Sequence, residues 1–148
     1  MTEKNAAQSY LARVEKIDAL VENKLIERQQ WKNLALSITA NMDGERVKSS
    51  GTTTSRMEDA VINCIMVEDE IAAAVERLIE VKKEVVRTIE RLNSPTEYRI
   101  LHMRYIQYIS LADIAEKLNR EYTWVTTVHG RAIKHVQELI DRKKRPGN

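Results

Sequence analysis

Hydroxyl-bearing and basic side chains gather in residues 120–134, directly after the segment SLADIAEKLN of residues 110–119. The set comprises Arg120, Tyr122, Thr123, Thr126, Thr127, Arg131 and Lys134, together with the indole of Trp124. Hydroxyls can contact phosphates or base edges, threonine methyls can contact thymine methyls, and cations pair with phosphates. The set therefore predicts an interface with double-stranded DNA rather than a catalytic centre.

Residue types that commonly carry catalysis or hold metals are few and poorly spaced. His102, His129 and His135 lack the i,i+4 spacing of a helical zinc pair, and Cys64 is the one cysteine. A phosphate-binding Gly-rich loop and a Gly-x-Ser-x-Gly turn are both absent from the sequence. We therefore expect no metal site, no cofactor and no enzymatic activity.

The elements that position the DNA-binding set are predicted to be helices. Ser94-Pro95-Thr96-Glu97 has the pattern of a helix start, with a capping Ser, Pro at the first position and Glu at the third. This helix is expected to run to about residue 105 or 107. Its inward candidates are Ile100, Leu101, Tyr105 and Ile106.

Two further helices are predicted after it. Ser110 is expected to cap a helix over residues 111–118, and Asn119 to end that helix in a left-handed conformation. The small side chain of Ala115 suits a close crossing with the following helix. That last helix is predicted over residues 122–141, with a buried stripe of Val125, Val128, Ala132, Ile133, Val136, Leu139 and Ile140. The hydroxyls and Gly130, Arg131 and Lys134 then face outward.

Two long helices are predicted before residue 93. In the second, positions 57, 61, 64, 68, 71, 75, 78, 82, 85, 89 and 92 are apolar except Glu68 and Lys82, at alternating spacings of four and three. Ser55 and Glu58 form a candidate capping box at its start. In the first, positions 10, 14, 17, 21, 24, 28, 31, 35 and 38 form a weaker line, interrupted by Lys24 and Arg28.

The two long helices suggest an antiparallel coiled-coil hairpin over residues 1–93, with a loop at about residues 41–55. Opposite positions should then sum to about 97, which places Arg28 near Glu68 and Asp69. Two such helices alone leave half of each apolar stripe in water, so either the C-terminal part folds back on them or a second chain completes a bundle. A homo-oligomer is expected, with a dimer favoured.

Charge is divided along the chain. Residues 1–95 hold 14 Lys/Arg and 16 Asp/Glu, a net charge of −2, whereas residues 96–148 hold 10 and 6, a net charge of +4. The basic excess coincides with residues 94–148, the predicted DNA-binding domain. No stretch approaches the ~20 apolar residues of a membrane span. The N-terminal residues also lack the apolar core of a signal peptide, so the expected location is the cytoplasm.

The segment YRILHMRYIQYISLADIAEKLNREYTWVTTVHGRAIKHVQEL resembles region 4 of sigma-70-type factors, which pairs a Tyr-rich helix with I-A-x-x-L and then a helix containing R-A. The order of parts and the phrase DGERVKSSG resemble small phage and prophage proteins akin to ArpU-type late-gene regulators. This resemblance implies a helix-turn-helix that binds promoter DNA in a bacterial host cell. Bacterial RNA polymerase is a further candidate partner.

Aligned through Arg131-Ala132, the family's reading positions fall on Tyr122, Thr123, Thr126 and Thr127. The family often carries charged or amide residues there, and this chain carries none. A helix-turn-helix packaging component of the small-terminase kind is one alternative to a transcription regulator. A protein-interaction module that docks a partner through Tyr122 and Trp124 is another.

Overall fold

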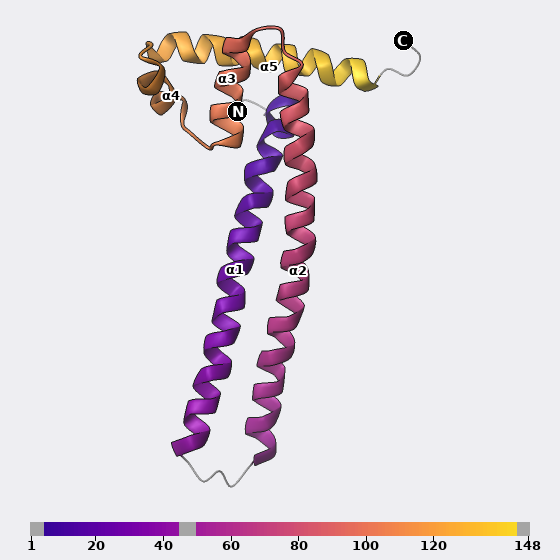
Figure 1. Ribbon diagram of the computed structural model, residues 1–148, viewed down its shortest axis with the longest axis vertical. Helices are drawn as coiled ribbons and strands as arrows, with labels where there is room; N and C mark the ends of the chain where they lie inside the picture. Colours follow the sequence, from indigo (N-terminus) through magenta and orange to yellow (C-terminus); the bar gives the residue numbers. More distant parts are fainter. Residues whose placement is uncertain (1–4, 45–49, 145–148) are drawn as a thin grey trace. The chain divides into compact units, whose positions relative to one another are not determined.

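The computed structural model describes residues 5–44 and 50–144, without the side chains of residues 41–44 and 50–54. All regular secondary structure in the described part is helical, which confirms the all-α prediction (Figure 1). The segments are α1 (Ala6–Gly44), α2 (Ser50–Glu90), α3 (Pro95–Leu101), the π-helix η1 (His102–Ile106), α4 (Leu111–Leu118) and α5 (Tyr122–Lys144). None of the described helices is long and apolar enough to cross a membrane.

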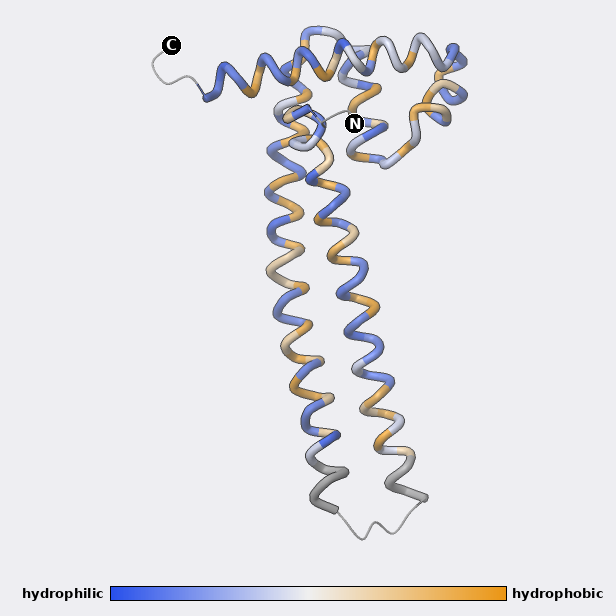
Figure 2. Tube along the Cα trace, turned by 180° about the vertical axis from the view of Figure 1, so that it is seen from behind, coloured by the Kyte–Doolittle hydropathy of each residue, from blue (hydrophilic) through white to orange (hydrophobic). Residues whose placement is uncertain are grey.

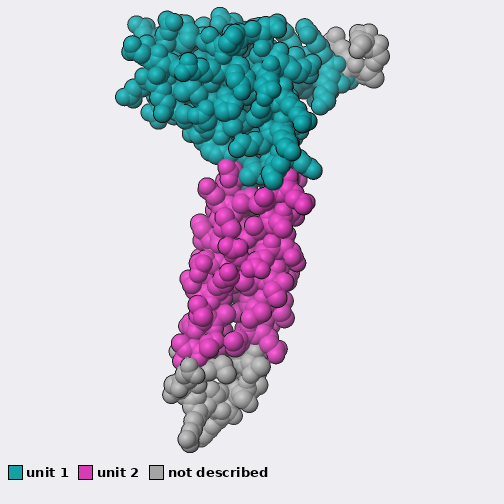
Figure 3. Space-filling model, viewed as in Figure 1, with its two compact units in different colours: residues 1–17, 78–148 teal, residues 18–77 magenta. Residues whose placement is uncertain are grey.

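The chain divides into two compact units (Figure 3). Unit 1 comprises residues 1–17 and 78–148, and unit 2 comprises residues 18–77. Unit 1 therefore combines the first turns of α1 and the last turns of α2 with everything that follows residue 90. The separation of residues 1–93 from 94–148 as functional domains stays a prediction.

Two clusters of buried side chains form the core of unit 1. The first joins α1, α2, the α3–η1 segment and α5 through Ala7, Leu11, Val14, Ile17, Val81, Val85, Ile89, Leu101, Tyr105, Ala132, Ile133 and Val136. The second joins the α3–η1 segment, α4 and α5 through Ile100, Met103, Ile114, Ala115, Val125 and Val128. Burial of this apolar surface is the main force that holds the short helices, which are too short to be stable alone.

Three end signals of the short helices are confirmed. The Ser94 hydroxyl accepts a hydrogen bond from the backbone N–H of Glu97 at 3.3 Å, with Pro95 as the first residue of α3. The Ser110 hydroxyl accepts one from the N–H of Asp113 at 3.1 Å, before α4. Asn119 is left-handed, with φ 54° and ψ 48°.

The helix predicted to run from residue 95 to about 105 or 107 changes its winding after Leu101. Residues 102–106 form a π-helix, in which the backbone N–H of Gln107 donates to the C=O of His102 at 3.1 Å. Both core clusters contain side chains from the continuous segment formed by α3 and η1. Leu101 and Tyr105 belong to the first, and Ile100 and Met103 to the second. The segment is therefore buried on two sides, which a local reading of periodicity did not reveal.

Unit 2 consists of residues 18–44 of α1 and residues 50–77 of α2. Its buried apolar side chains are Val21, Ile38, Ala60, Val67 and Ala74. Lys24 forms an ion pair with Glu70, and the hydroxyl of Thr39 lies 3.9 Å from the sulfur of Met57. Apolar residues are distributed around both helices rather than along one line of each (Figure 2).

The predicted contact line of α2 is wrong at every second position. Positions 60, 67, 74 and 81 are buried, whereas positions 61, 68, 75 and 82 are exposed. The sequence holds two overlapping heptad lines that share positions 64, 71, 78 and 85. The observed line adds only alanine and valine, whereas the predicted one adds Glu68 and Lys82, and burying an unpaired charge is costly. On α1 the predicted line holds better, because positions 14, 17, 21 and 38 are buried.

Two details of the hairpin prediction also differ. α1 continues to Gly44 and α2 begins at Ser50, so the helices extend into the loop expected at residues 41–55. Ser55 lies inside α2 and cannot cap its start. The loop was predicted because Ser, Thr and Gly have low helix propensity. Such propensities are weak preferences that the rest of the structure can override. The buried Nε of Arg28 has no hydrogen-bond partner, and the proximity of Arg28 to Glu68 and Asp69 stays a prediction. Residues 45–49, which hold most of the DGERVKSSG phrase, lie outside the described residues.

Candidate nucleic-acid interface

The turn between α4 and α5 sets the start of α5. The backbone N–H of Arg120 donates to the C=O of Ala115 at 2.9 Å, and that of Asn119 to the C=O of Glu116 at 3.1 Å. These two hydrogen bonds, with Asn119 in the left-handed conformation, satisfy carbonyl groups at the end of α4. They allow the chain to leave α4 and begin α5 after three residues. Tyr122 is the first residue of α5.

The second core cluster fixes which side of α5 faces outward. Ala115 of α4 is buried at this contact, together with Val125 and Val128 of α5. Because a helix turns about 100° per residue, burial at these positions and at Ala132 sends Thr123, Thr127 and Lys134 to the opposite side.

The predicted site residues divide into an exposed majority and a half-buried pair. Residues Arg120, Tyr122, Thr123, Thr127, Arg131 and Lys134 are exposed, and Trp124 and Thr126 are half-buried. The outward face of α5, as we call it, is formed by Tyr122, Thr123, Thr126, Thr127, Gly130, Arg131 and Lys134, all of them exposed except the half-buried Thr126.

Three threonines of this face are joined by hydrogen bonds. The hydroxyls of Thr126 and Thr127 both donate to the backbone C=O of Thr123, at 2.9 Å and 2.8 Å. A hydroxyl has one hydrogen, so in this arrangement both oxygens are left as acceptors only. The pair therefore presents acceptors and methyl groups, a chemistry that residue types alone did not specify.

Gly130 leaves a bare strip of backbone on the same face. A Cβ added there would meet no atom within 4 Å. Close packing inside the chain therefore does not require glycine at this position. Gly130 follows Thr126 and Thr127 by one turn, so an approaching molecule can come near the helix backbone there.

Trp124 and Arg120 are held against the body of the protein. The Arg120 guanidinium lies 4.6 Å from the centroid of the Trp124 ring, within the range of a cation–π contact. Trp124 also packs against the second core cluster. This contact holds Arg120 beside the first turn of α5, where its charge adds to the outward face.

A comparison with known protein families gives a match that includes the outward face of α5. The family described as "Protein of unknown function (DUF1492)" matches residues 38–137. The chain belongs to the DUF1492 family. The match includes α2, α3, η1 and α4 in full and α5 as far as Gln137, so the outward face lies within it. No curated protein matches the chain, and no solved structure does.

A buried polar pair supports the inner side of α5 in this DUF1492 member. The Tyr105 hydroxyl and His129 Nε2 are 2.8 Å apart, and the two rings stack with centroids 5.7 Å apart. Burial, assisted by the charge of Arg104, lowers the pKa of His129, and burial raises the pKa of Tyr105. The neutral histidine can accept the tyrosine hydrogen.

The lowered pKa of His129 has a definite consequence for stability. The unfolded chain binds a proton on this group near the ordinary value of 6.5, and the folded protein does so only at lower pH. Its contribution to stability is therefore fully present above that value and is lost as the pH falls towards the folded pKa. Sequence reasoning missed this pair, because nothing in the spacing of Tyr105 and His129 brings them together.

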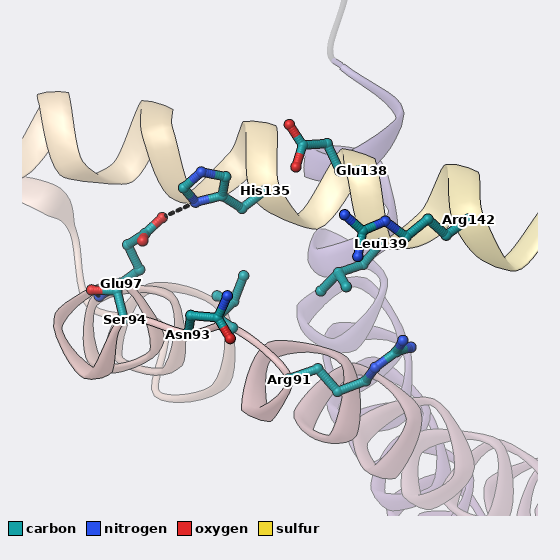
Figure 4. A pocket seen from close by; sticks show the side chains of 9 residues that line it. Arg91, Asn93, Ser94, Glu97, His135, Glu138, Leu139 and Arg142 are labelled. Atoms are coloured by element: carbon teal, nitrogen blue, oxygen red, sulfur yellow. Dashed lines mark hydrogen bonds and ion pairs between the residues drawn. The ribbon is translucent and has the colours of Figure 1, made fainter.

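A cleft beside α5 carries the second polar pair that the sequence did not predict. His135 and the buried carboxylate of Glu97 form a hydrogen-bonded pair at 2.5 Å (Figure 4). Arg91, directly after α2, and Arg142, from α5, line the same cleft. Glu138 lines it too, so cations and carboxylates are balanced there. We therefore assign this pair to the attachment of α3 to α5 and not to ligand binding. In the described part of the chain, no group of three or more His, Cys, Asp or Glu side chains could hold a metal ion.

Proposed function

We propose that this DUF1492 protein is a sequence-specific DNA-binding regulator of transcription, of the phage and prophage kind, with a helix-turn-helix formed by α4 and α5. The observation that carries the proposal is the outward face of α5. Short polar side chains, a bare glycine and flanking cations lie together on the exposed side of a helix whose opposite side is buried. A helix of this kind fits the DNA major groove.

The face divides into two kinds of contact. Arg120, Arg131 and Lys134 supply positive charge for the phosphates, a contribution that is independent of sequence. Thr126 and Thr127 supply methyl groups and acceptor oxygens, which suit the thymine methyl and the amino groups of adenine and cytosine. Specificity would thus rest on short contacts and groove shape rather than on long amide or guanidinium side chains.

Binding to DNA is tested by titration at several salt concentrations, after selection of bound fragments from a random DNA pool. Arg131→Ala and Lys134→Ala should each weaken binding to every sequence and reduce the salt slope by about one. Lys83→Ala, which removes a charge from α2 instead, is the matched control and should leave the slope unchanged. If the wild type binds no DNA at low salt, the proposal is wrong.

The same preparation tests the alternatives. A packaging component of the small-terminase kind would have the mass of a ring of many copies. A protein-interaction module would bind no DNA and would lose its partner on Tyr122→Ala, which alters an exposed ring and leaves the core intact. Binding of bacterial RNA polymerase is an additional expectation for a region 4-like regulator, and it is measured by retention of the purified polymerase.

A further inference from the structure

Unit 2 carries an uncovered apolar line on α2. Val61, Ile65 and Val75 are 44%, 53% and 36% exposed, and Ala72 between them is exposed too. Spacings of four, seven and three residues keep all four on one side of the helix. Val61 and Val75 belong to the heptad line that the sequence predicted as a helix–helix contact, and both are left exposed by the contact with α1.

A groove between the two helices of unit 2 continues this apolar surface. The residues that line it include Lys32 and Leu36 from α1 and Val61, Ile65 and Glu68 from α2. Leu36 is 67% exposed. Leu25 lies eleven residues earlier, three helical turns away on the same side, and is exposed as well. We call this side of unit 2, from Leu25 to Leu36 and from Val61 to Val75, the groove face.

Two charged side chains that line the groove, Lys32 and Glu68, do not form an ion pair with each other within one chain. Lys32 and Glu68 are both exposed, and neither takes part in an ion pair. Lys24 and Glu70, which do not line the groove, pair within the chain. A two-fold symmetric contact brings residue i of one copy to residue j of the other and the reverse, so it can form the Lys32–Glu68 pair twice.

The extent of the groove face fits one half of a modest interface. Its five exposed large side chains offer on the order of 400 Å² of apolar surface, against about 500 Å² for the apolar share of one partner in a standard homodimer. An apolar area of this size is in the range of the largest patch on a typical monomer, and such patches are often functional. Lys32 and Glu68, which line the groove, supply polar groups of the kind that such interfaces also contain.

We propose that the groove face binds the groove face of a second copy of this chain, so that the helices of unit 2 from two copies form a four-helix contact. The second copy is favoured over an unrelated partner because this face carries both members of a complementary pair and a self-compatible heptad spacing.

The test is sedimentation equilibrium of the full chain without DNA, so its outcome is independent of DNA binding. The wild type should have the mass of a dimer across the micromolar range. Ile65→Glu should weaken dimerisation at least a hundredfold, because it places a carboxylate in the middle of the apolar contact. Met66→Glu is the matched control. Met66 has the same 53% exposure, lies about 100° further round the helix and does not line the groove.

A charge exchange tests the pairing itself. Lys32→Glu and Glu68→Lys should each weaken dimerisation several-fold, and the double variant should restore it. Circular dichroism shows whether each variant keeps its helix content. A monomeric wild type, a Met66→Glu variant that dissociates as readily as Ile65→Glu, or an assembly that Ile65→Glu leaves intact overturns the proposal.

Discussion

The two units of this protein are built from similar helices but differ in what covers them. In unit 1, two core clusters enclose side chains from as many as five elements, and Leu11, Ile89, Leu101, Ile114 and Val136 are fully buried. In unit 2, two helices have only each other. All large exposed apolar side chains of the described residues except Ile79 and Tyr122 lie there. Helix length is therefore a poor guide to stability, and the number of packing neighbours decides how much apolar surface leaves water.

The largest expected effect comes from comparing two leucines of the same helix. Leu11→Ala removes a fully buried side chain of unit 1 and should cost about 2–5 kcal/mol in the free energy of unfolding. Leu20→Ala alters a 47% exposed side chain of unit 2 and should cost below about 1 kcal/mol. Chemical denaturation measures both. Equal losses would show that the contrast between the units is false.

Ala115→Leu tests the packing of α4 on α5 with a somewhat smaller effect. Three extra carbon atoms at this buried contact should destabilise unit 1 by roughly 1–3 kcal/mol through overpacking. Ala73→Leu makes the same change at an exposed position of α2 and serves as the control. Thermal unfolding distinguishes them, and an unchanged melting temperature for Ala115→Leu would show that α4 and α5 do not cross closely at Ala115.

Sequence reasoning succeeded where a local rule decides the outcome. Ser94 and Ser110 were identified as caps, and Asn119 as a left-handed residue, because hydrogen bonds within a few residues determine these features. The buried stripe of α5 was also predicted at Val125, Val128 and Ala132, because one side of that helix is strongly apolar.

Sequence reasoning failed where two arrangements were locally equivalent or where the partners were distant. The two heptad lines of α2 share half of their positions, and only the partner helix and the cost of burying Glu68 decide between them. The Tyr105–His129 and Glu97–His135 pairs span 24 and 38 residues, so no periodicity indicates them. The acceptor-only state of Thr126 and Thr127 depends on side-chain rotation about a backbone carbonyl, which residue type does not fix.

Gly130→Ala tests an exposed position of α5, for both helix stability and DNA binding. Because a Cβ has open space there, alanine should stabilise α5 by about 1 kcal/mol. If DNA approaches the backbone at this strip, the added methyl should at the same time weaken DNA binding. Thermal unfolding and DNA titration of the same variant measure the two effects. A variant that is more stable and binds DNA as well as the wild type would make Gly130 an ordinary surface position.

The smallest effect distinguishes the methyls of the outward face from its hydroxyls. Replacing Thr126 and Thr127 with serine removes the methyls and keeps the hydroxyls, whereas valine keeps a methyl surface and removes the hydroxyls. DNA in which uracil replaces thymine lacks the partner methyl. A buried methyl is worth about 0.8 kcal/mol, or about fourfold in affinity. The wild type and the valine variants should therefore prefer thymine DNA by about this factor, and the serine variants should not. Serine variants that keep the preference would assign the discrimination to the acceptor oxygens or to groove shape instead.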